Sequence, residues 1–178
     1  PSQSEIIGLL GELVVLRSLV KLDPQRGLQS WFGPDQSRHD FEFANHAVEV
    51  KTTTRVASKA IEVHGKAQLS RAPGSSLHLT LLQVDRALDG LSVASLVSDI
   101  IDAGVARADL AAKLAKWFPA GISQLPSWAS KYSFKLTAIT TYAVDDEFPI
   151  PDPSKFGPSV EPRVTSFSCT LNLDGIAG

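Results

Sequence analysis

Apolar residues recur at helical spacing near the start of the chain. Between Ser4 and Leu22 they occupy i, i+3, i+4 and i+7 positions, and the members of this stripe are Ile6, Leu9, Leu10, Leu13, Leu16 and Val20. This period predicts an amphipathic helix. Ser2 and Glu5 have the spacing of a capping box at its start, and Asp23-Pro24 predicts its end.

A carboxylate lies beside this apolar stripe. Glu12 stands between Gly11 and Leu13, next to positions that face the core. Acidic side chains are rarely fully buried unless they are paired, so this position marks Glu12 as a candidate functional residue. A glutamate at the helix edge that extends to water would explain the same pattern, and this segment alone favours that simpler interpretation.

Strict alternation of apolar and polar residues follows a loop predicted over residues 27–38. The alternation lies on both sides of Ala44-Asn45-His46, which has the composition of a turn, and its apolar positions are Phe41, Phe43, Val48 and Val50. This pattern predicts a β-hairpin whose second strand turns its valines toward the core.

The hairpin places charged residues close together. Residues two apart on a strand point to the same face, about 6.5 Å apart, so Glu49 and Lys51 are expected side by side. Pairing across the hairpin brings Asp40 toward Glu49. Two carboxylates beside one ammonium group predict a site for a hard divalent cation. A salt-bridged pair on an exposed sheet face is the competing interpretation, and it would contribute little to stability.

The rest of the chain mixes helical and alternating patterns. Residues 60–63 predict a third short strand or a helix start, and the further predicted elements are a short helix over 65–71, a strand over 77–84, helices over 92–103 and 108–118, and strands over 132–144 and 164–173. This order predicts an α/β fold with a central mixed β-sheet flanked by helices. The length of 178 residues predicts a single domain over residues 1–178.

Composition narrows the class of protein. A content of 43% hydrophobic and 20% charged residues is typical of a soluble globular protein, and no apolar run is long enough to span a membrane. Cys169 is the single cysteine, which excludes a disulfide framework within one chain. These features predict a cytoplasmic protein. The start at Pro1 and the absence of methionine predict a fragment of a longer protein, whose N-terminal part could hold a DNA-recognition or partner domain.

Charge is distributed unevenly although the net charge is only -2. One stretch holds five basic residues against the single acid Glu62, namely Lys51, Arg55, Lys59, Lys66 and Arg71. Basic side chains beside an acidic metal site suit contact with a phosphate backbone, so Arg55 and Lys66 are candidate DNA contacts. A second basic stretch, between Arg107 and Lys135, is better explained by solvated helix and loop faces.

Asp40 followed by Glu49-Val50-Lys51 resembles the motif of the PD-(D/E)XK nuclease superfamily. The residue before the aspartate is His39 rather than proline, a departure that this divergent superfamily tolerates. Some members of the superfamily also carry a helical glutamate like Glu12 and a polar helix residue like Gln68. The resemblance covers about residues 4 to 85. The same stretch resembles a poorly characterised bacterial family that is assigned to this superfamily and discussed beside restriction and phage-defence systems. The resemblance also implies a restriction-endonuclease-like core.

The resemblance implies a role for each residue of the motif. Asp40 and Glu49, with the Val50 carbonyl, would bind Mg²⁺, for which Mn²⁺ can substitute. Lys51 would orient or polarise the attacking water, or stabilise the charge of the transition state. Glu12 would join the metal ligands or bind a second ion, and Gln68 would position substrate or water.

These residues lead to the hypothesis of a metal-dependent DNA endonuclease in restriction or phage defence. A homodimer would be needed to cut both strands at once. One alternative is a nuclease-fold protein that binds nucleic acid or a protein partner without cutting, and another is an interaction module with an incidental motif. RNA stays open as a substrate. Trp31 and Trp128 stay open as base-stacking residues, whereas packing explains Trp117 better.

Overall fold

The computed structural model describes residues 1–35, 37–54, 57–64, 66–150 and 168–178. The α-helices are α1 (Gln3–Val20), α2 (Pro24–Gln29), α3 (Val93–Asp102), α4 (Arg107–Lys113) and α5 (Trp128–Lys131). The strands are β1 (Phe41–Glu42), β2 (His46–Thr53), β3 (Ala60–His64), β4 (Ser76–Leu91), β5 (Phe134–Ala143) and β6 (Ser168–Asn172). Two 3₁₀ helices, η1 (Gly33–Asp35) and η2 (Lys66–Leu69), complete the elements.

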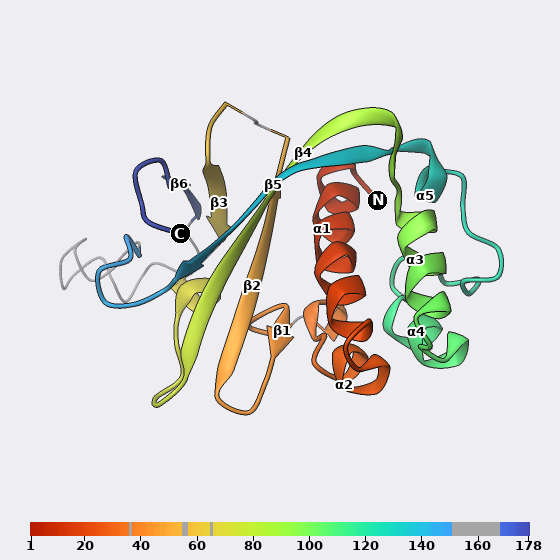
Figure 1. The fold of residues 1–178 in the computed structure, drawn as a ribbon, viewed down its shortest axis with the longest axis horizontal. Helices are drawn as coiled ribbons and strands as arrows, with labels where there is room; N and C mark the ends of the chain where they lie inside the picture. The colour runs from red at the N-terminus through yellow and green to blue at the C-terminus, as the bar shows by residue number, and fades with distance from the viewer. Residues whose placement is uncertain (36, 55–56, 65, 151–167) are drawn as a thin grey trace.

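The central sheet is mixed and has the strand order β1-β2-β4-β5. β1 and β2 form the predicted antiparallel hairpin, with Phe41 opposite Val48, whereas β4 runs parallel to β2 and antiparallel to β5. β3 and β6 form a separate antiparallel pair. Figure 1 shows α1 and α3 on one side of the central strands and this small pair on the other. The predicted α/β fold with a central mixed sheet flanked by helices is confirmed.

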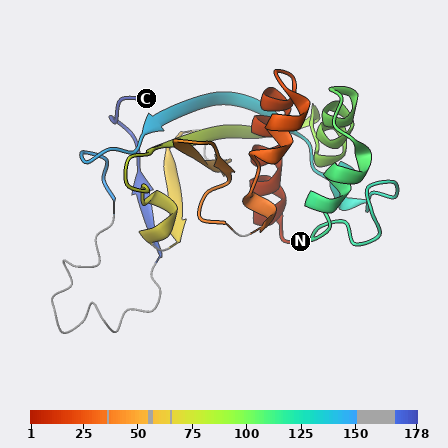
Figure 2. The same cartoon turned by 90° about the horizontal axis from the view of Figure 1, so that it is seen from below.

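Alternate positions along β2 and β4 belong to two hydrophobic clusters on opposite faces of the sheet. Val50 and Leu82 pack with α1 and α3, while Ala47 and Leu79 pack with β3 and with Leu173. In the turned view, the helices gather toward one end of the long β4–β5 ribbon and the β3–β6 pair toward the other (Figure 2). The face that carries Glu49 and Lys51 is therefore covered by protein, and an exposed salt-bridged face is excluded.

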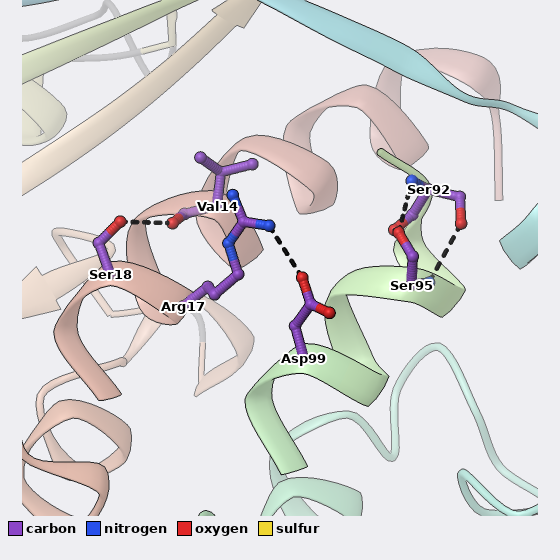
Figure 3. A network of polar contacts seen from close by, with 6 residues as sticks. All are labelled: Val14, Arg17, Ser18, Ser92, Ser95 and Asp99. Carbon is purple, nitrogen blue, oxygen red and sulfur yellow. Dashed lines mark hydrogen bonds and ion pairs between the residues drawn. The ribbon is translucent and has the colours of Figure 1, made fainter. Parts of the chain in front are cut away.

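α1 is fixed at its start and along its length by polar contacts. The predicted capping box of Ser2 and Glu5 is present. Farther along, Arg17 forms an ion pair with Asp99 of α3 at 2.8 Å, and Ser92 begins α3 with a capping box of its own (Figure 3). No helix within the described ranges is long and apolar enough to span a bilayer.

The prediction of a loop over residues 27–38 is wrong at its start, because the first of these residues belong to α2. Asp23 does not simply end α1, because its side chain accepts hydrogen bonds from the backbone N–H groups of Gln25 and Arg26 and begins α2 at Pro24. Proline at the first helical position is pre-organised for a helix start. The strand predicted over 77–84 continues to Leu91 as β4. The start of the strand predicted over 164–173 lies outside the described residues.

α1 approaches β2 closely at one glycine. A Cβ atom on Gly11 would lie 1.8 Å from Thr52 Oγ1, so only glycine permits this contact between helix and sheet. The approach brings the next residue, Glu12, to the sheet edge at which β1 and β2 separate.

The Thr52 hydroxyl gives a first prediction. Its oxygen is buried and has no hydrogen-bond partner among the described residues. An unpaired buried hydroxyl costs about 1–3 kcal/mol. We therefore expect Thr52→Ala, which removes the hydroxyl without placing a methyl group against Gly11, to be at least as stable as Thr52→Ser, which keeps the hydroxyl and also loses the methyl group. Chemical denaturation would measure this, and a Thr52→Ala protein clearly less stable than Thr52→Ser would show that the hydroxyl is paired.

Candidate active site

The candidate site forms where β1 turns away from β2. The Asp40 carbonyl accepts hydrogen bonds from the backbone N–H groups of Phe32 at 2.7 Å and Gly33 at 3.1 Å, on the side away from β2. The N–H of Val50 is therefore not paired with β1 and donates instead to Asp40 Oδ2 at 2.7 Å. This bond holds the Asp40 carboxylate against the edge of β2, beside Glu49.

Glu49 and Lys51 form a buried ion pair on the face shared with β3. Lys51 Nζ lies 2.8 Å from Glu49 Oε1, and their side chains are 16% and 4% exposed, respectively. Lys51 Nζ also donates to Gln68 Oε1 at 3.0 Å. The same oxygen accepts the backbone N–H of His64 at 3.0 Å. Gln68 thus connects the lysine to β3 and lies beside Lys51, while its role in positioning substrate or water stays a prediction.

Glu12 brings a third carboxylate to the site from α1. The indole N–H of Trp31 donates to Glu12 Oε2 at 2.8 Å. Gly33 lies against the same carboxylate, because a Cβ atom there would sit 2.1 Å from Glu12 Oε2. The side chain of Glu12 is therefore enclosed by residues of the 31–33 segment and does not simply extend to water.

Burial raises the pKa values of all three carboxyl groups, and repulsion by neighbouring carboxylates adds to it at Glu12 and Glu49. Burial, reinforced by Asp40 and Glu49, raises the pKa of Glu12 to about 8. Burial together with Asp40 raises the pKa of Glu49 to about 7, even though Lys51 lowers it. Burial raises the pKa of Asp40 as well, against the opposing effects of the Val50 N–H and Lys51. One ammonium group is thus too little positive charge to keep three carboxylates ionised here.

The donor set fits a hard divalent cation by its chemistry. Carboxylate oxygens are the ligands that Mg²⁺ prefers, and a dication would supply the positive charge that Lys51 alone does not. No three acidic, histidine or cysteine side chains in the described ranges are already grouped as a metal site. The fit therefore rests on charge and on donor type.

Three sequence predictions about contacts remain predictions. Arg55 and Lys66 were predicted as DNA contacts. Arg55 lies outside the described residues, and for Lys66, the first residue of η2, the structure describes the backbone alone. Val50 contributes its N–H to Asp40, and its carbonyl as a metal ligand is untested. His39, which stands where the motif has proline, is buried, and its Nε2 has no partner among the described residues.

Trp31 and Gly33 are site residues that the sequence analysis did not identify. The 31–33 segment was predicted as loop, and Trp31 was considered only as a base-stacking residue. Trp31 is fully buried, so stacking on a base is excluded. The sequence feature that could have identified this segment is the pair Trp31-Phe32, in a stretch otherwise rich in glycine, proline and polar residues. Two adjacent aromatic residues in such a stretch indicate that it packs against the protein core.

Comparison with known families agrees with this geometry. A family model described as "Putative PD-(D/E)XK family member, (DUF4420)" matches residues 1–174. No curated protein and no solved structure gives a significant match. The family match extends the resemblance from residues 4–85 through nearly the whole chain, and the mixed sheet and the cluster around Lys51 lie within it. The chain therefore belongs to DUF4420, a family of the PD-(D/E)XK nuclease superfamily.

Proposed function

We propose that this protein is a metal-dependent endonuclease that hydrolyses phosphodiester bonds in DNA. The observation that carries the proposal is the arrangement at the sheet edge that bears the PD-(D/E)XK motif, where the Val50 N–H holds Asp40 beside the buried Glu49–Lys51 ion pair and burial raises the pKa values of Asp40, Glu49 and Glu12. A protein that needed this region only for stability would gain little from enclosing acids that repel one another.

Asp40, Glu49 and Glu12, with the Val50 carbonyl, would hold Mg²⁺ or Mn²⁺. When bound, the cation supplies Lewis acidity toward the phosphate and positive charge for the transition state. The chain itself orients Asp40 through the Val50 N–H and Glu12 through the Trp31 N–H. These hydrogen bonds limit the reorganisation that ligand binding would otherwise require.

Lys51 is the residue that would act on the reacting groups. Its ammonium group is fixed by Glu49 and Gln68, so it is pre-organised to orient an attacking water and to stabilise negative charge on the phosphate. Gln68 uses its oxygen for Lys51 and His64. The two N–H donors of its amide are the atoms that these contacts leave for substrate or water.

DNA as substrate, a role in restriction or phage defence, and a homodimer for duplex cleavage are parts of the same proposal. They are supported by the superfamily and by basic residues along 51–71, which suit a phosphate backbone. Arg55 and Lys66 remain the candidate backbone contacts within this stretch.

Cleavage of supercoiled plasmid and of single-stranded DNA, with Mg²⁺ or Mn²⁺, tests the proposal. We expect cutting by the wild type and a loss of at least about 100-fold in Lys51→Met, since removal of one pre-organised charge-stabilising group costs about 10²–10³ in rate. Asp40→Asn should lose activity as well. Lys135→Met, which changes an exposed lysine on β5, is the control and should cut normally.

Two outcomes would contradict this assignment. Equal cutting by Lys51→Met and Lys135→Met would show that the site is elsewhere. A folded wild type that binds DNA and cuts neither substrate with either metal would favour a nuclease-fold protein that has kept binding without catalysis.

A further inference from the structure

Trp31 is buried, and its side chain donates a hydrogen bond to Glu12 of the candidate site. Its side chain is 0% exposed, so it contacts neither solvent nor substrate. The indole N–H is a donor that cannot accept a hydrogen bond, and it is directed at Glu12 Oε2 at a distance of 2.8 Å. The contact joins residues 19 apart in sequence. Trp31 can therefore influence the site by fixing the position of this carboxylate.

The residues after Trp31 extend the contact to a second carboxylate. Gly33 lies against Glu12 so closely that any side chain would displace it. The backbone N–H groups of Phe32 and Gly33 donate to the carbonyl of Asp40. One three-residue segment thus holds the Glu12 side chain and the Asp40 main chain together, although these residues belong to different elements of the fold.

A lysine on α4 holds this segment from the other side. Lys113 Nζ donates to the Trp31 carbonyl at 2.7 Å and pairs with Asp35 at 2.7 Å. It also lies 4.9 Å from the centre of the Phe32 ring, within cation–π range. Lys113 was expected on a solvated helix face, but its side chain is only 22% exposed. α4 therefore contributes to the arrangement of the site without reaching it.

We propose that Trp31 is a positioning residue for divalent-cation binding, that it acts by hydrogen-bonding Glu12, and that Lys113 supports it. The proposal rests on the metal-dependent function proposed above. Without the indole N–H, Glu12 could adopt other rotamers, and its recruitment by a cation would cost conformational freedom. Hydrogen-bond partners of metal ligands typically contribute about 10–100-fold to metal affinity.

Binding of Mn²⁺ in the absence of DNA tests this proposal without relying on cleavage. Electron paramagnetic resonance of free Mn²⁺ would give the Kd for the wild type, Trp31→Phe and Trp128→Phe. Phenylalanine keeps most of the buried ring and removes the N–H. We expect the Kd to rise about 10–100-fold in Trp31→Phe, and to stay unchanged in Trp128→Phe, whose tryptophan stacks on Phe118. Lys113→Met should raise the Kd by a smaller factor.

A second measurement applies even if Trp31→Phe fails to fold. In a Trp117→Phe, Trp128→Phe protein, Trp31 is the remaining tryptophan of the three in the chain. Paramagnetic Mn²⁺ bound to Glu12 should quench its fluorescence, and diamagnetic Mg²⁺ should restore it by competition. Normal Mn²⁺ binding by Trp31→Phe, or binding without quenching, would overturn the positioning role alone. A wild type that binds no Mn²⁺ would overturn the metal site and the proposed function together.

Discussion

Glu12→Gln should make the metal-free protein more stable at pH 8, not less stable. Burial first, and Asp40 second, raise the pKa of Glu12 from 4.5 to about 8. The folded state therefore holds a proton that the unfolded state releases at much lower pH. Stability that comes from this proton is fully present below about pH 4.5 and is lost as the pH rises through about 8. Glutamine keeps the shape and can still accept the Trp31 N–H, but it never ionises.

The expected gain follows from the size of the shift. One pKa unit corresponds to about 1.4 kcal/mol, and Glu12 keeps some solvent contact, so we expect a gain of about 2–3 kcal/mol at pH 8. At pH 5 the difference from wild type should nearly vanish. Urea denaturation with a chelator, between pH 5 and pH 9, measures both values. Glu62→Gln, at a solvent-exposed glutamate of β3, is the control and should leave the pH dependence unchanged.

Added Mg²⁺ should reduce the stability difference between the two proteins. A cation that binds only the folded state stabilises it by mass action, so the wild type should gain more from Mg²⁺ at pH 8 than Glu12→Gln does. If Glu12→Gln were less stable at pH 8 without metal, Glu12 would have to be paired with a cationic group, and the crowding of carboxylates argued above would be wrong.

Gly11→Ala should disturb both stability and the site. The added Cβ atom would lie 1.8 Å from Thr52 Oγ1 and 3.1 Å from Thr52 Cβ, so the contact between α1 and β2 must shift. Overpacking of this kind costs about 1–3 kcal/mol. Glu12, the next residue, would move with the helix, and we expect metal binding and cleavage to fall along with stability.

A double variant and a neighbouring glycine make this prediction specific. Thr52→Ala removes the clashing oxygen, so Gly11→Ala should cost less in that background than in the wild type, as chemical denaturation of the four proteins would show. Gly8 lies in the same helix, and a Cβ atom there would meet nothing within 4 Å. Gly8→Ala should therefore stabilise the protein by about 0.5–1 kcal/mol. Identical behaviour of Gly8→Ala and Gly11→Ala would disprove the close contact.

The sequence by itself determined the local elements and the central motif. The capping box and apolar period predicted α1, and the alternation around Ala44-Asn45-His46 predicted the hairpin that aligns Asp40 with Glu49. These features depend on residues a few positions apart, whose spacing sets which side chains share a face. The mixed sheet flanked by helices followed from the order of such elements, and the motif within it indicated the superfamily.

Some local signals were present but misinterpreted. Asp23-Pro24 marks both the end of α1 and the start of α2, because an aspartate before proline can cap a new helix as well as stop the preceding one. Glu12 looked like a helix-edge residue when only its own segment was considered. The resemblance to the PD-(D/E)XK superfamily suggested that Glu12 lies near the motif, whereas the apolar period of the helix did not.

Only the tertiary structure decided the environment of these residues. The β3–β6 pair covers the Glu49 face, and β6 lies more than 100 residues after β2 in the chain. Trp31 reaches Glu12 across 19 positions, and Lys113 reaches Trp31 across 82. Burial and charge–charge distance set the pKa values of the carboxyl groups, and both depend on which distant segments pack together. Periodicity carries no information on that packing, because it records which face of an element is apolar and not what will cover it.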